Sequence, residues 1–474
     1  MSTARRRGWV LLCTVALSGC RKKPPPPPVE PPPVPVSSVK APVASAAPPA
    51  PVPALAPVQA TIGWRALAEA KECGTKERDL DPNLAFGTLG IAARGKDLGV
   101  ALHYVTRVKG EGLLAFAGYN SLTQTLAVGH GLGKAGMSPA KVFPRKNDFV
   151  VAWFDALGLS FTKTSWAANL PDVERLPAVT PAEAGHTAIL QLPDGGFLVA
   201  VPLTPGTSEQ ISLFRFDLSG DGPSSVKALG VTRKASGPDH AAMAAVGDSF
   251  LVAWDDLPAK EKPRVIAITH FDAQGKEGDA IETLSSPDHA ATQPVMASGE
   301  RGAVVAWTEG EGEATSVVVR AVDEHGKIAG PATRIASGQL PVLSATKEGY
   351  VLSLLKRGDA SAPPQVATVH LDAAGRPAAG GYLVSELGKG KGAVAGAPAS
   401  AVTEDGRAAI GFVYSDGMRS HLVSVKVDGC LATGGAGSAP PASSASASSS
   451  ASAASSAPAA ASAPPAGSAS ATVH

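Results

Sequence analysis

The segment Pro-Asp-His-Ala-Ala occurs twice in this sequence, and each time it sets a carboxylate beside an imidazole. The two copies place Asp239 beside His240 and Asp288 beside His289, and His186 stands at the matching place in AGHTAIL. Imidazole and carboxylate groups bind metal ions and hydrogen-bond to anionic sugars. If these five residues surround the mouth of a channel, they predict a binding site there. The alternative is that turn residues were copied by duplication without converging on a ligand.

An acidic residue ends each of three similar runs, FVVAWFD, FLVAWDD and AVVAWTE. These acids are Asp155, Asp256 and Glu309. In an antiparallel hairpin, the start of the first strand and the end of the second lie at the same edge. We therefore place the acids on the same face as the Asp-His pairs, where they would bind a cation or a basic partner. The alternative is that they only finish hairpins.

The sequence contains no motif typical of catalysis. Gly-x-Ser-x-Gly, His-Glu-x-x-His, a P-loop and Gly-x-Gly-x-x-Gly after a strand are all missing, as is zinc-type Cys/His spacing. Carboxylates are plentiful, but no close pair stands out for acid–base chemistry. Equivalent positions on neighbouring repeats are also widely spaced for a single metal ion. We predict no catalytic residue, metal or cofactor, and we leave enzymatic activity open, with a non-catalytic role preferred.

The elements that position these residues repeat at about fifty residues, the period of a β-propeller blade. Seven apolar runs align on the residues Leu102, Trp153, Val201, Trp254, Trp307, Leu354 and Phe412. The sequence therefore predicts an all-β fold, a seven-bladed β-propeller of four-stranded blades, with six or eight blades as alternatives. The tryptophans are expected to pack between blades rather than to bind ligand.

The unit from His240 to Ser286 shows how one blade is built. Two apolar runs flank a turn at Gly247-Asp248, a third run is RVIAITHFD, and the fourth, GDAIETLSS, is more polar, as an outer edge strand should be. The third run ends in a repeated Asp-x-x-Gly segment, seen in FRFDLSG, THFDAQG, RAVDEHG and VHLDAAG. Here the Asp is expected to bond the turn backbone, and the Gly to take a positive φ.

This combination resembles the tryptophan-containing β-propeller repeats of secreted proteins and lipoproteins in myxobacteria and their relatives. In that family a VAW-x-D strand is followed by an R-x-x-D-x-x-G turn, as FLVAWDD and RAVDEHG illustrate here. The resemblance covers about residues 103–430. It implies a fold and no activity.

The N-terminus has the pattern of a lipoprotein signal. Three arginines precede GWVLLCTVALSG, an apolar stretch too short to span a bilayer as a helix. The following LSGC resembles the bacterial lipobox, which implies that Cys20 is lipidated, palmitate included, and becomes the mature N-terminus. We expect a signal peptide over 1–19 and a membrane anchor made by lipid. Arg21, where an Asp would resemble a retention signal, favours the outer membrane, on its periplasmic or surface side.

Composition divides the remaining chain into three parts. Residues 20–60 hold the lipidated cysteine and a proline-rich stalk, and residues 433–474 are mainly Ala, Ser, Gly and Pro. Both are predicted to be disordered, and the propeller is predicted over 61–432. The last unit lacks a fourth strand, which we expect Gln59–Ala66 to supply from the N-terminus.

Cys73 and Cys430 bracket the predicted propeller. In an oxidising compartment they are expected to pair in a disulfide that closes the ring, because Cys13 leaves with the signal peptide and Cys20 takes lipid. The formal net charge of +1 gives no reason to expect a nucleic acid partner.

These features predict an envelope-anchored lipoprotein whose propeller is a binding or scaffold module for a protein or a polysaccharide. The main alternative is a propeller-type glycan hydrolase or lyase, and a lesser one is an envelope assembly factor. An enzyme should show carboxylates converging at one mouth of the channel. A binding module should show an exposed apolar or aromatic patch on one face.

Overall fold

β-Strands make up nearly all the regular structure of this computed structural model, and all of the described residues fall within Pro53–His474. Within them the helical structure is a single 3-10 turn, Gly312–Ala314. No helix among these residues is long and apolar enough to cross a membrane. The described residues are 56–66, 74–79, 84–106, 112–120, 125–134, 140–155, 158–164, 174–176, 187–203, 210–219, 222–231, 237–358, 363–384, 393–394, 396–404, 406, 408–415 and 420–427.

Four antiparallel sheets of four strands each follow one another along the chain. The first holds β4 (Leu84–Arg94), β5 (Asp97–Thr106), β6 (Gly112–Asn120) and β7 (Thr125–Lys134). The second holds β8 (Lys141–Pro144), β9 (Phe149–Asp155), β10 (Gly158–Thr164) and β11 (Glu174–Leu176). The third holds β12 (Ala188–Gln191), β13 (Phe197–Leu203), β14 (Gln210–Ser219) and β15 (Gly222–Val231). The fourth holds β16 (Ala241–Val246), β17 (Ser249–Asp256), β18 (Val265–Phe271) and β19 (Glu277–Thr283).

The next two groups of strands share the long strand β23 (Thr333–Ala345). Its first part pairs with β22 and its second part with β24. One group holds β20 (Ala291–Gly299), β21 (Gly302–Glu309) and β22 (Ser316–Asp323), and the other holds β24 (Gly349–Lys356), β25 (Gln365–Asp372) and β26 (Pro377–Leu383). A last sheet holds β27 (Ala393–Val394), β28 (Ala399–Val402), β29 (Ala408–Ser415) and β30 (Ser420–Val427).

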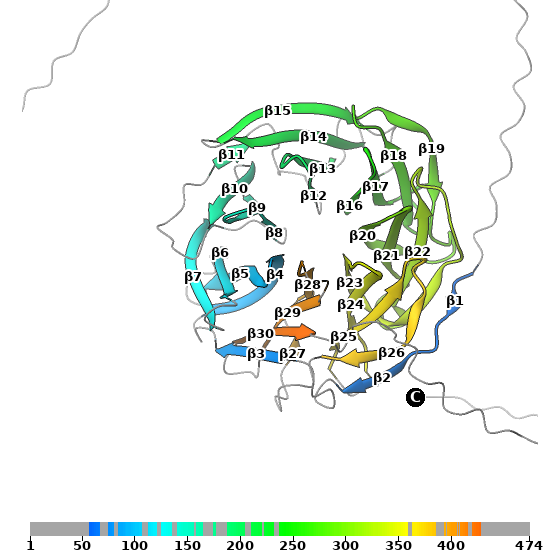
Figure 1. The fold of residues 1–474 in the computed structure, drawn as a ribbon. Helices are drawn as coiled ribbons and strands as arrows, with labels where there is room; N and C mark the ends of the chain where they lie inside the picture. The colour runs from blue at the N-terminus through cyan, green and yellow to red at the C-terminus, as the bar shows by residue number, and fades with distance from the viewer. Residues whose placement is uncertain are drawn as a thin grey trace, which may run out of the picture. The chain divides into compact units, whose positions relative to one another are not determined.

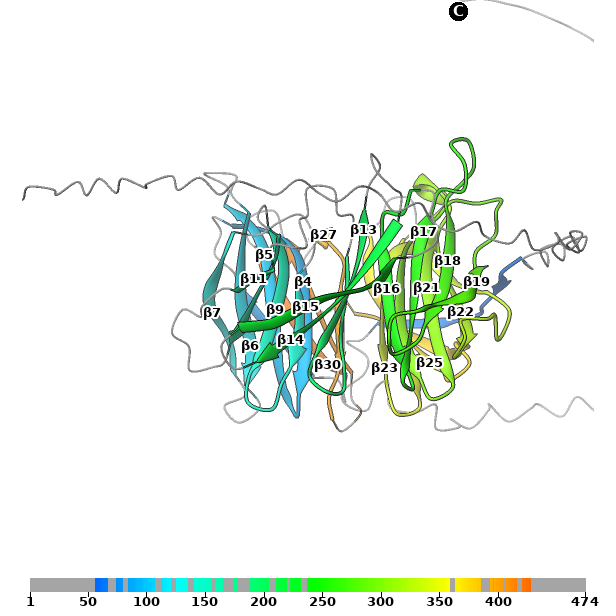
Figure 2. The ribbon, with the colours of Figure 1, turned by 90° about the horizontal axis from the view of Figure 1, so that it is seen from above.

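Successive sheets pack face to face in a closed series, which is the architecture of a β-propeller (Figures 1 and 2). Seven apolar clusters join each group of strands to the next. The cluster that returns to the start unites Ala399 and Ala401 of β28 with Leu89 and Ile91 of β4. Figure 1 shows the first strand of each group nearest the centre and the later strands further out. The predicted all-β propeller fold is therefore confirmed.

The residues that marked the repeat all lie in the second strand of a group and are buried, at 2% exposure or less. Trp254 of β17 packs among Leu198 and Ala200 of the preceding sheet. Trp307 of β21 likewise packs in one cluster with Leu251 of β17, in the preceding sheet. Full burial of one such large apolar side chain contributes about 1.5–3 kcal/mol. The prediction that tryptophans pack between sheets is confirmed.

Three of the four Asp-x-x-Gly segments form the predicted turn. Asp272 Oδ1 accepts the N–H groups of Gln274 and Lys276 at 3.0 and 2.8 Å, and Gly275 has φ +81°. The same bonds recur at Asp323 and Asp372. Asp217 instead lies within β14, which continues to Ser219 and still pairs with β15. Gly220 lies outside the described residues, so the turn predicted there stays a prediction.

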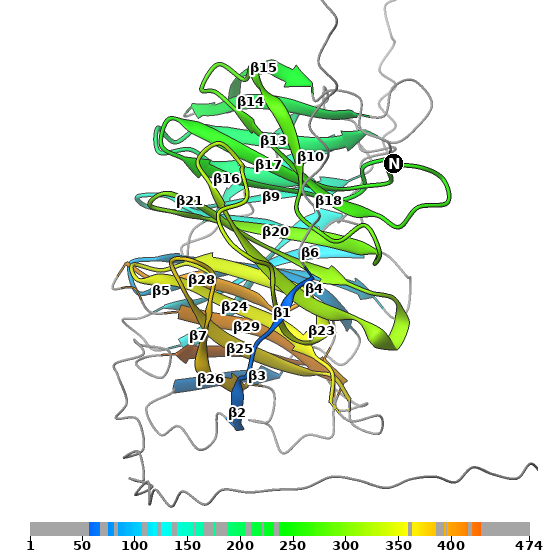
Figure 3. The same cartoon turned by 90° about the vertical axis from the view of Figure 1, so that its right-hand side faces the viewer.

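The N-terminal segment closes the ring, but by a different strand from the predicted one (Figure 1). β3 (Gly74–Asp79) pairs antiparallel with β30 and supplies the missing outer strand of the last sheet. Gln59–Ala66 instead contributes to β1 (Val58–Gln59) and β2 (Gly63–Ala66), which pair in parallel with β23 and β26 (Figure 3).

The reason for this difference lies in β26. A Cβ on Gly381 would lie 2.6 Å from the Trp64 ring, so only a glycine there leaves room for that ring. Ile62 and Trp64 pack against the cluster beneath. Gln59–Ala66 therefore contains strand structure, as predicted. The strand with which Trp64 pairs depends on the space that Gly381 leaves on β26.

Several predictions fall outside the described residues. They are the signal peptide, the lipidated Cys20, most of the 20–60 stalk, the 433–474 tail, and the cysteines Cys73 and Cys430.

We expect Gly275→Ala to lower the free energy of unfolding by about 1–3 kcal/mol. Its φ of +81° strains any residue with a Cβ, and that Cβ would meet Leu229 Cβ at 2.6 Å. Urea denaturation followed by tryptophan fluorescence measures the change. Gly330→Ala is the control, because a Cβ there has no atom within 4 Å. Equal stability of the two variants would contradict this account of the turn.

Candidate functional site

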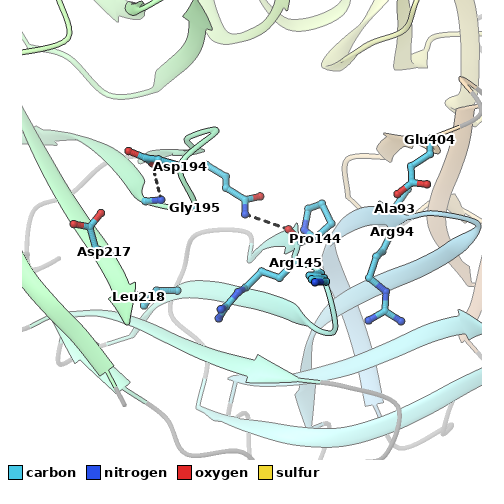
Figure 4. Close-up of a pocket in the computed structure, with 12 residues that line it drawn as sticks. Ala93, Arg94, Pro144, Arg145, Asp194, Gly195, Asp217, Leu218 and Glu404 are labelled. Carbon is cyan, nitrogen blue, oxygen red and sulfur yellow. Dashed lines mark hydrogen bonds between the residues drawn. The ribbon is translucent and has the colours of Figure 1, made fainter. Parts of the chain in front are cut away.

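A hollow of about 760 Å³ lies where four turns between first and second strands meet (Figure 4). The turns are those of β4–β5, β8–β9, β12–β13 and β28–β29. We call this site the turn hollow. Its charged lining residues are Arg94, Arg145, Lys146, Asp194, Asp217 and Glu404. The volume is that of a site for a small ligand or a short chain segment.

Hydrogen bonds tie neighbouring turns of the hollow to each other. Gln191 Nε2 donates to Pro144 O at 3.1 Å, which joins the β12–β13 turn to the β8–β9 turn. Glu404 N donates to Gly95 O at 3.4 Å, which joins the β28–β29 turn to the β4–β5 turn. Because these bonds use backbone atoms and one side-chain amide, they fix the positions of the turns without occupying the charged side chains.

The acidic wall of the hollow is held in its ionised form. Asp194 accepts the N–H of Gly196 at 2.9 Å and an Nη2–H of Arg215 at 2.5 Å. Arg215 Nη2 also lies 3.8 Å from Asp217 Oδ1. The hydrogen bond from Gly196 lowers the pKa of Asp194, burial opposes it, and Arg215 lowers it further. A carboxylate in this setting is a fixed negative acceptor.

The basic wall comes from the two turns before it. Arg94 pairs with Asp97 at 3.3 Å, and its guanidinium carbon lies 5.1 Å from the centre of the Phe149 ring. Arg145 Nε lies 3.6 Å from Asp148 Oδ1. Such cation–π and ion-pair contacts orient the guanidinium groups while leaving them at the surface.

At the opposite ends of the strands, the first Asp-His pair is organised by a residue that the sequence did not single out. Asp255 is fully buried and accepts the N–H groups of Asp239 and His240 at 3.1 and 3.0 Å. His240 Nδ1 lies 2.8 Å from its other oxygen, and Arg264 Nη1 lies 3.3 Å from Oδ1.

This network also joins two sheets, because Gln293 N of β20 donates to Asp255 Oδ2 at 3.3 Å. Burial alone would raise the pKa of Asp255. The hydrogen bonds and charge of His240, with the charge of Arg264, outweigh that effect and hold the pKa below its usual value. His240 therefore belongs to a hydrogen-bond network around Asp255 that joins two sheets, and its side chain is only 15% exposed.

The second Asp-His pair has different surroundings. Ala242 pairs with Ala253, whereas Ala291, the matching residue of the second copy, pairs with Glu309 because a bulge between Thr292 and Val295 shifts the register. Asp288 and His289 are exposed and line a second pocket of about 450 Å³. Glu309 lines the same pocket, but it is buried and bonds Trp307 Nε1 at 3.3 Å and Arg334 Nη2 at 3.1 Å.

The structure thus brings together three of the residues predicted at the channel mouth and separates others. Asp288, His289 and Glu309 share the second pocket, whereas Asp239 and His240 surround Asp255. Asp256 is half-buried at the end of β17. His186 and the side chain of Asp155 lie outside the described residues. In the described part of the chain, no group of three or more His, Cys, Asp or Glu residues is arranged to hold a metal ion. Ligand binding at the predicted residues stays a prediction.

The turn hollow was not predicted because most of its charged residues lie in or beside turns, outside the repeated segments; Asp217 of the repeated FRFDLSG segment is the exception. The signal was present as charge in four turn segments that precede the second strands: ARGKD, PRKND, PDGG and TEDG. Charged turns are common on any surface. Only their convergence from four neighbouring sheets makes them a site.

No protein-family model matches this chain, and no curated protein matches it. Among solved structures it is similar to an α-L-arabinanase of Penicillium chrysogenum complexed with arabinobiose (11% identity, 73% of this chain and 94% of that chain, TM-score 0.40). It is also similar to the GH93 α-L-arabinofuranosidase of Fusarium graminearum (8%, 75% and 98%, TM-score 0.41) and to the six-bladed fucose-binding lectin of Aleuria aurantia (12%, 63% and 95%, TM-score 0.41). At these TM-scores the likeness carries no argument about function, which rests on the residues of the chain itself.

We expect Asp255→Asn to lower the free energy of unfolding at neutral pH by about 3 kcal/mol, because the neutral amide no longer pairs with Arg264 and replaces one acceptor oxygen of a buried, fully hydrogen-bonded carboxylate. The pKa of Asp255 is lower in the folded chain than in the unfolded chain. Its stabilisation is therefore present above the unfolded value of about 3.9 and is lost as the pH falls through the folded value.

Urea denaturation between pH 2.5 and 7 measures this effect. The parent chain should lose stability below about pH 4, and Asp255→Asn should show a shallower acid decline. Asp288→Asn, at an exposed position of the repeated segment, is the control and should follow the parent curve. An Asp255→Asn curve parallel to that of the parent would contradict the role of this carboxylate.

Proposed function

We propose that this chain is a non-catalytic binding module of the cell envelope and that the turn hollow is where a protein or a polysaccharide docks. The observation that carries this proposal is that the best-defined carboxylate of the hollow, Asp194, is held ionised by Gly196 and Arg215. The Asp194 carboxylate can only accept hydrogen bonds, and the Arg94 and Arg145 guanidinium groups can only donate them. Charged groups whose positions are fixed in this way form a recognition surface for a ligand.

The alternative, a glycan hydrolase or lyase, needs different electrostatics. A glycosidase requires one carboxyl group whose pKa is raised, so that it carries the proton for the leaving group. Asp194 has a lowered pKa, and Asp217 faces the same guanidinium of Arg215. Asp194 therefore does not fit the role of that proton donor.

For the scaffold we propose seven blades, each of four strands in its complete form. The seven apolar clusters that link successive groups of strands support this count, as do the seven second strands that carry the repeat marker. Because β23 pairs with β22 at one end and with β24 at the other, two of the proposed blades form one hydrogen-bonded sheet.

For the anchor we propose lipidation of Cys20 and attachment to the outer membrane. The support is the order of charge, apolar stretch, small residues and cysteine at the N-terminus. We also propose a Cys73–Cys430 disulfide, because Cys73 directly precedes β3 and Cys430 shortly follows β30 in sequence. In those strands Gly74 lies opposite Lys426.

Photo-crosslinking from the hollow tests the binding proposal. Replacing Leu218, a half-buried lining residue, with benzoylphenylalanine should yield a crosslinked protein or saccharide in intact envelopes. The same replacement at Ile281, which is 39% exposed on β19, should not. Cleavage of envelope glycans by the purified chain, abolished by Asp194→Asn, would instead establish the enzymatic alternative.

Substitution at the lipidation site tests the anchor. Cys20→Ala should remove incorporated fatty acid and move the chain from the membrane fraction to the soluble fraction, because several acyl chains supply the membrane affinity. Metabolic fatty-acid labelling with fractionation measures both effects. Cys13→Ala, which changes a cysteine inside the predicted signal peptide, is the matched control and should stay in the membrane fraction.

A further inference from the structure

Most charged side chains that line the turn hollow already have a partner within the chain. Pairs are formed by Arg94 with Asp97, Arg145 with Asp148, and Asp194 with Arg215. Among the described lining residues, Lys146 and Glu404 are exposed and have neither an ion pair nor a side-chain hydrogen bond. The hollow thus offers one unpaired positive charge and one unpaired negative charge.

These two charges are held apart by the fold. Lys146 lies on the β8–β9 turn and Glu404 on the β28–β29 turn, and the sheet that begins with β4 packs between their two sheets. The backbone bond from Glu404 N to Gly95 O fixes one side, and the bond from Gln191 to Pro144 O fixes the other. Figure 4 shows Glu404 beside Arg94, with Pro144 and Arg145 on the other side of Arg94.

The opposite signs restrict the ligand. A simple anion would be attracted by Lys146 but repelled by Glu404, and a simple cation would be attracted by Glu404 but repelled by Lys146. A ligand with one charge of each sign satisfies both residues at once. Charge pairs at the rim of an interface contribute modest affinity, but they set orientation and suppress wrong partners.

One lining residue of the hollow, Gly195, leaves room for a second chain. Gly195 has φ +87°, and a Cβ there would have no atom within 4 Å, so another backbone can approach closely. The described lining residues include no Trp, Tyr or Phe to stack on the apolar face of a sugar.

Building on the proposed binding function, we infer that the ligand of the turn hollow is a peptide segment carrying both a carboxylate and an ammonium group. Its carboxylate faces Lys146 and its ammonium group faces Glu404. The partner is therefore a protein rather than a neutral polysaccharide.

The test uses the full chain and defined probes in ligand-observed NMR titrations. The probes are end-blocked peptides with one Glu and one Lys separated by two to six glycines, the same peptides with Gln at both places, and cellohexaose. The Glu/Lys peptides should bind about tenfold or more tightly than the Gln peptides, and raising the salt concentration should weaken that binding.

Charge reversal tests the two residues. Lys146→Glu or Glu404→Lys alone should weaken binding of the Glu/Lys peptides about fivefold or more. The double variant should recover it, because the peptide binds in the reverse direction. Lys260→Glu and Glu300→Lys, at exposed positions outside the hollow, are matched controls that should leave the affinity unchanged.

Several results would overturn the inference. Equal binding of charged and neutral peptides would do so, as would loss in the control variants or no recovery in the double variant. Binding of cellohexaose that is unaffected by Lys146→Glu would leave the binding function intact and assign it to a polysaccharide. Failure of every probe would reject the peptide class, and crosslinking from Leu218 then decides the binding function separately.

Discussion

The whole structure depends on second strands that are apolar on both faces. In β21 every residue is buried, and in β17 and β24 only the end residues are partly exposed. A strand of this kind is stable only when a sheet covers each side, because each exposed large side chain would forfeit about 1.5–3 kcal/mol. No sheet can therefore stand alone, and the series must close on itself. The strand β3 completes the last sheet by pairing with β30, and β1 and β2 pair with β23 and β26.

This burial separates the parts of a repeat that must stay constant from the parts that can vary. The second strand keeps a large apolar side chain, since Trp254 and Trp307 both pack against the preceding sheet. The residue after the tryptophan differs between repeats. Asp255 bonds His240, Arg264 and Gln293. Thr308 stands at the same place in the next repeat. The two Asp-His segments therefore acquired different environments although their sequences agree.

The turns at the ends of the strands are under less constraint, and this is where charge accumulates. The β8–β9 turn carries Arg145 and Lys146 without cost to the core, because these side chains stay at the surface. Closure of the ring then brings the β28–β29 turn, from the last sheet, beside turns of the first three sheets, so that the four turns meet in one hollow. The strands repeat because they must pack against one another. The hollow that they form is lined by charged turn residues that differ from one repeat to the next.

The sequence by itself determined the strand type, the period and most turns, because these depend on local patterns of apolar residues and on Asp-x-x-Gly chemistry. Trp153, Trp254 and Trp307 lie where the repeat placed them, and Gly275 has the expected positive φ. Only the tertiary structure decided which strand closes the ring, since Gln59–Ala66 and Gly74–Asp79 are both compatible with an edge and the gap at Gly381 selects between edges. It also decided which polar residues meet. A bulge before Val295 shifts His289 away from the position of His240, and no local pattern reveals that Arg94, Lys146, Asp194 and Glu404 converge, because convergence is a property of the closed ring.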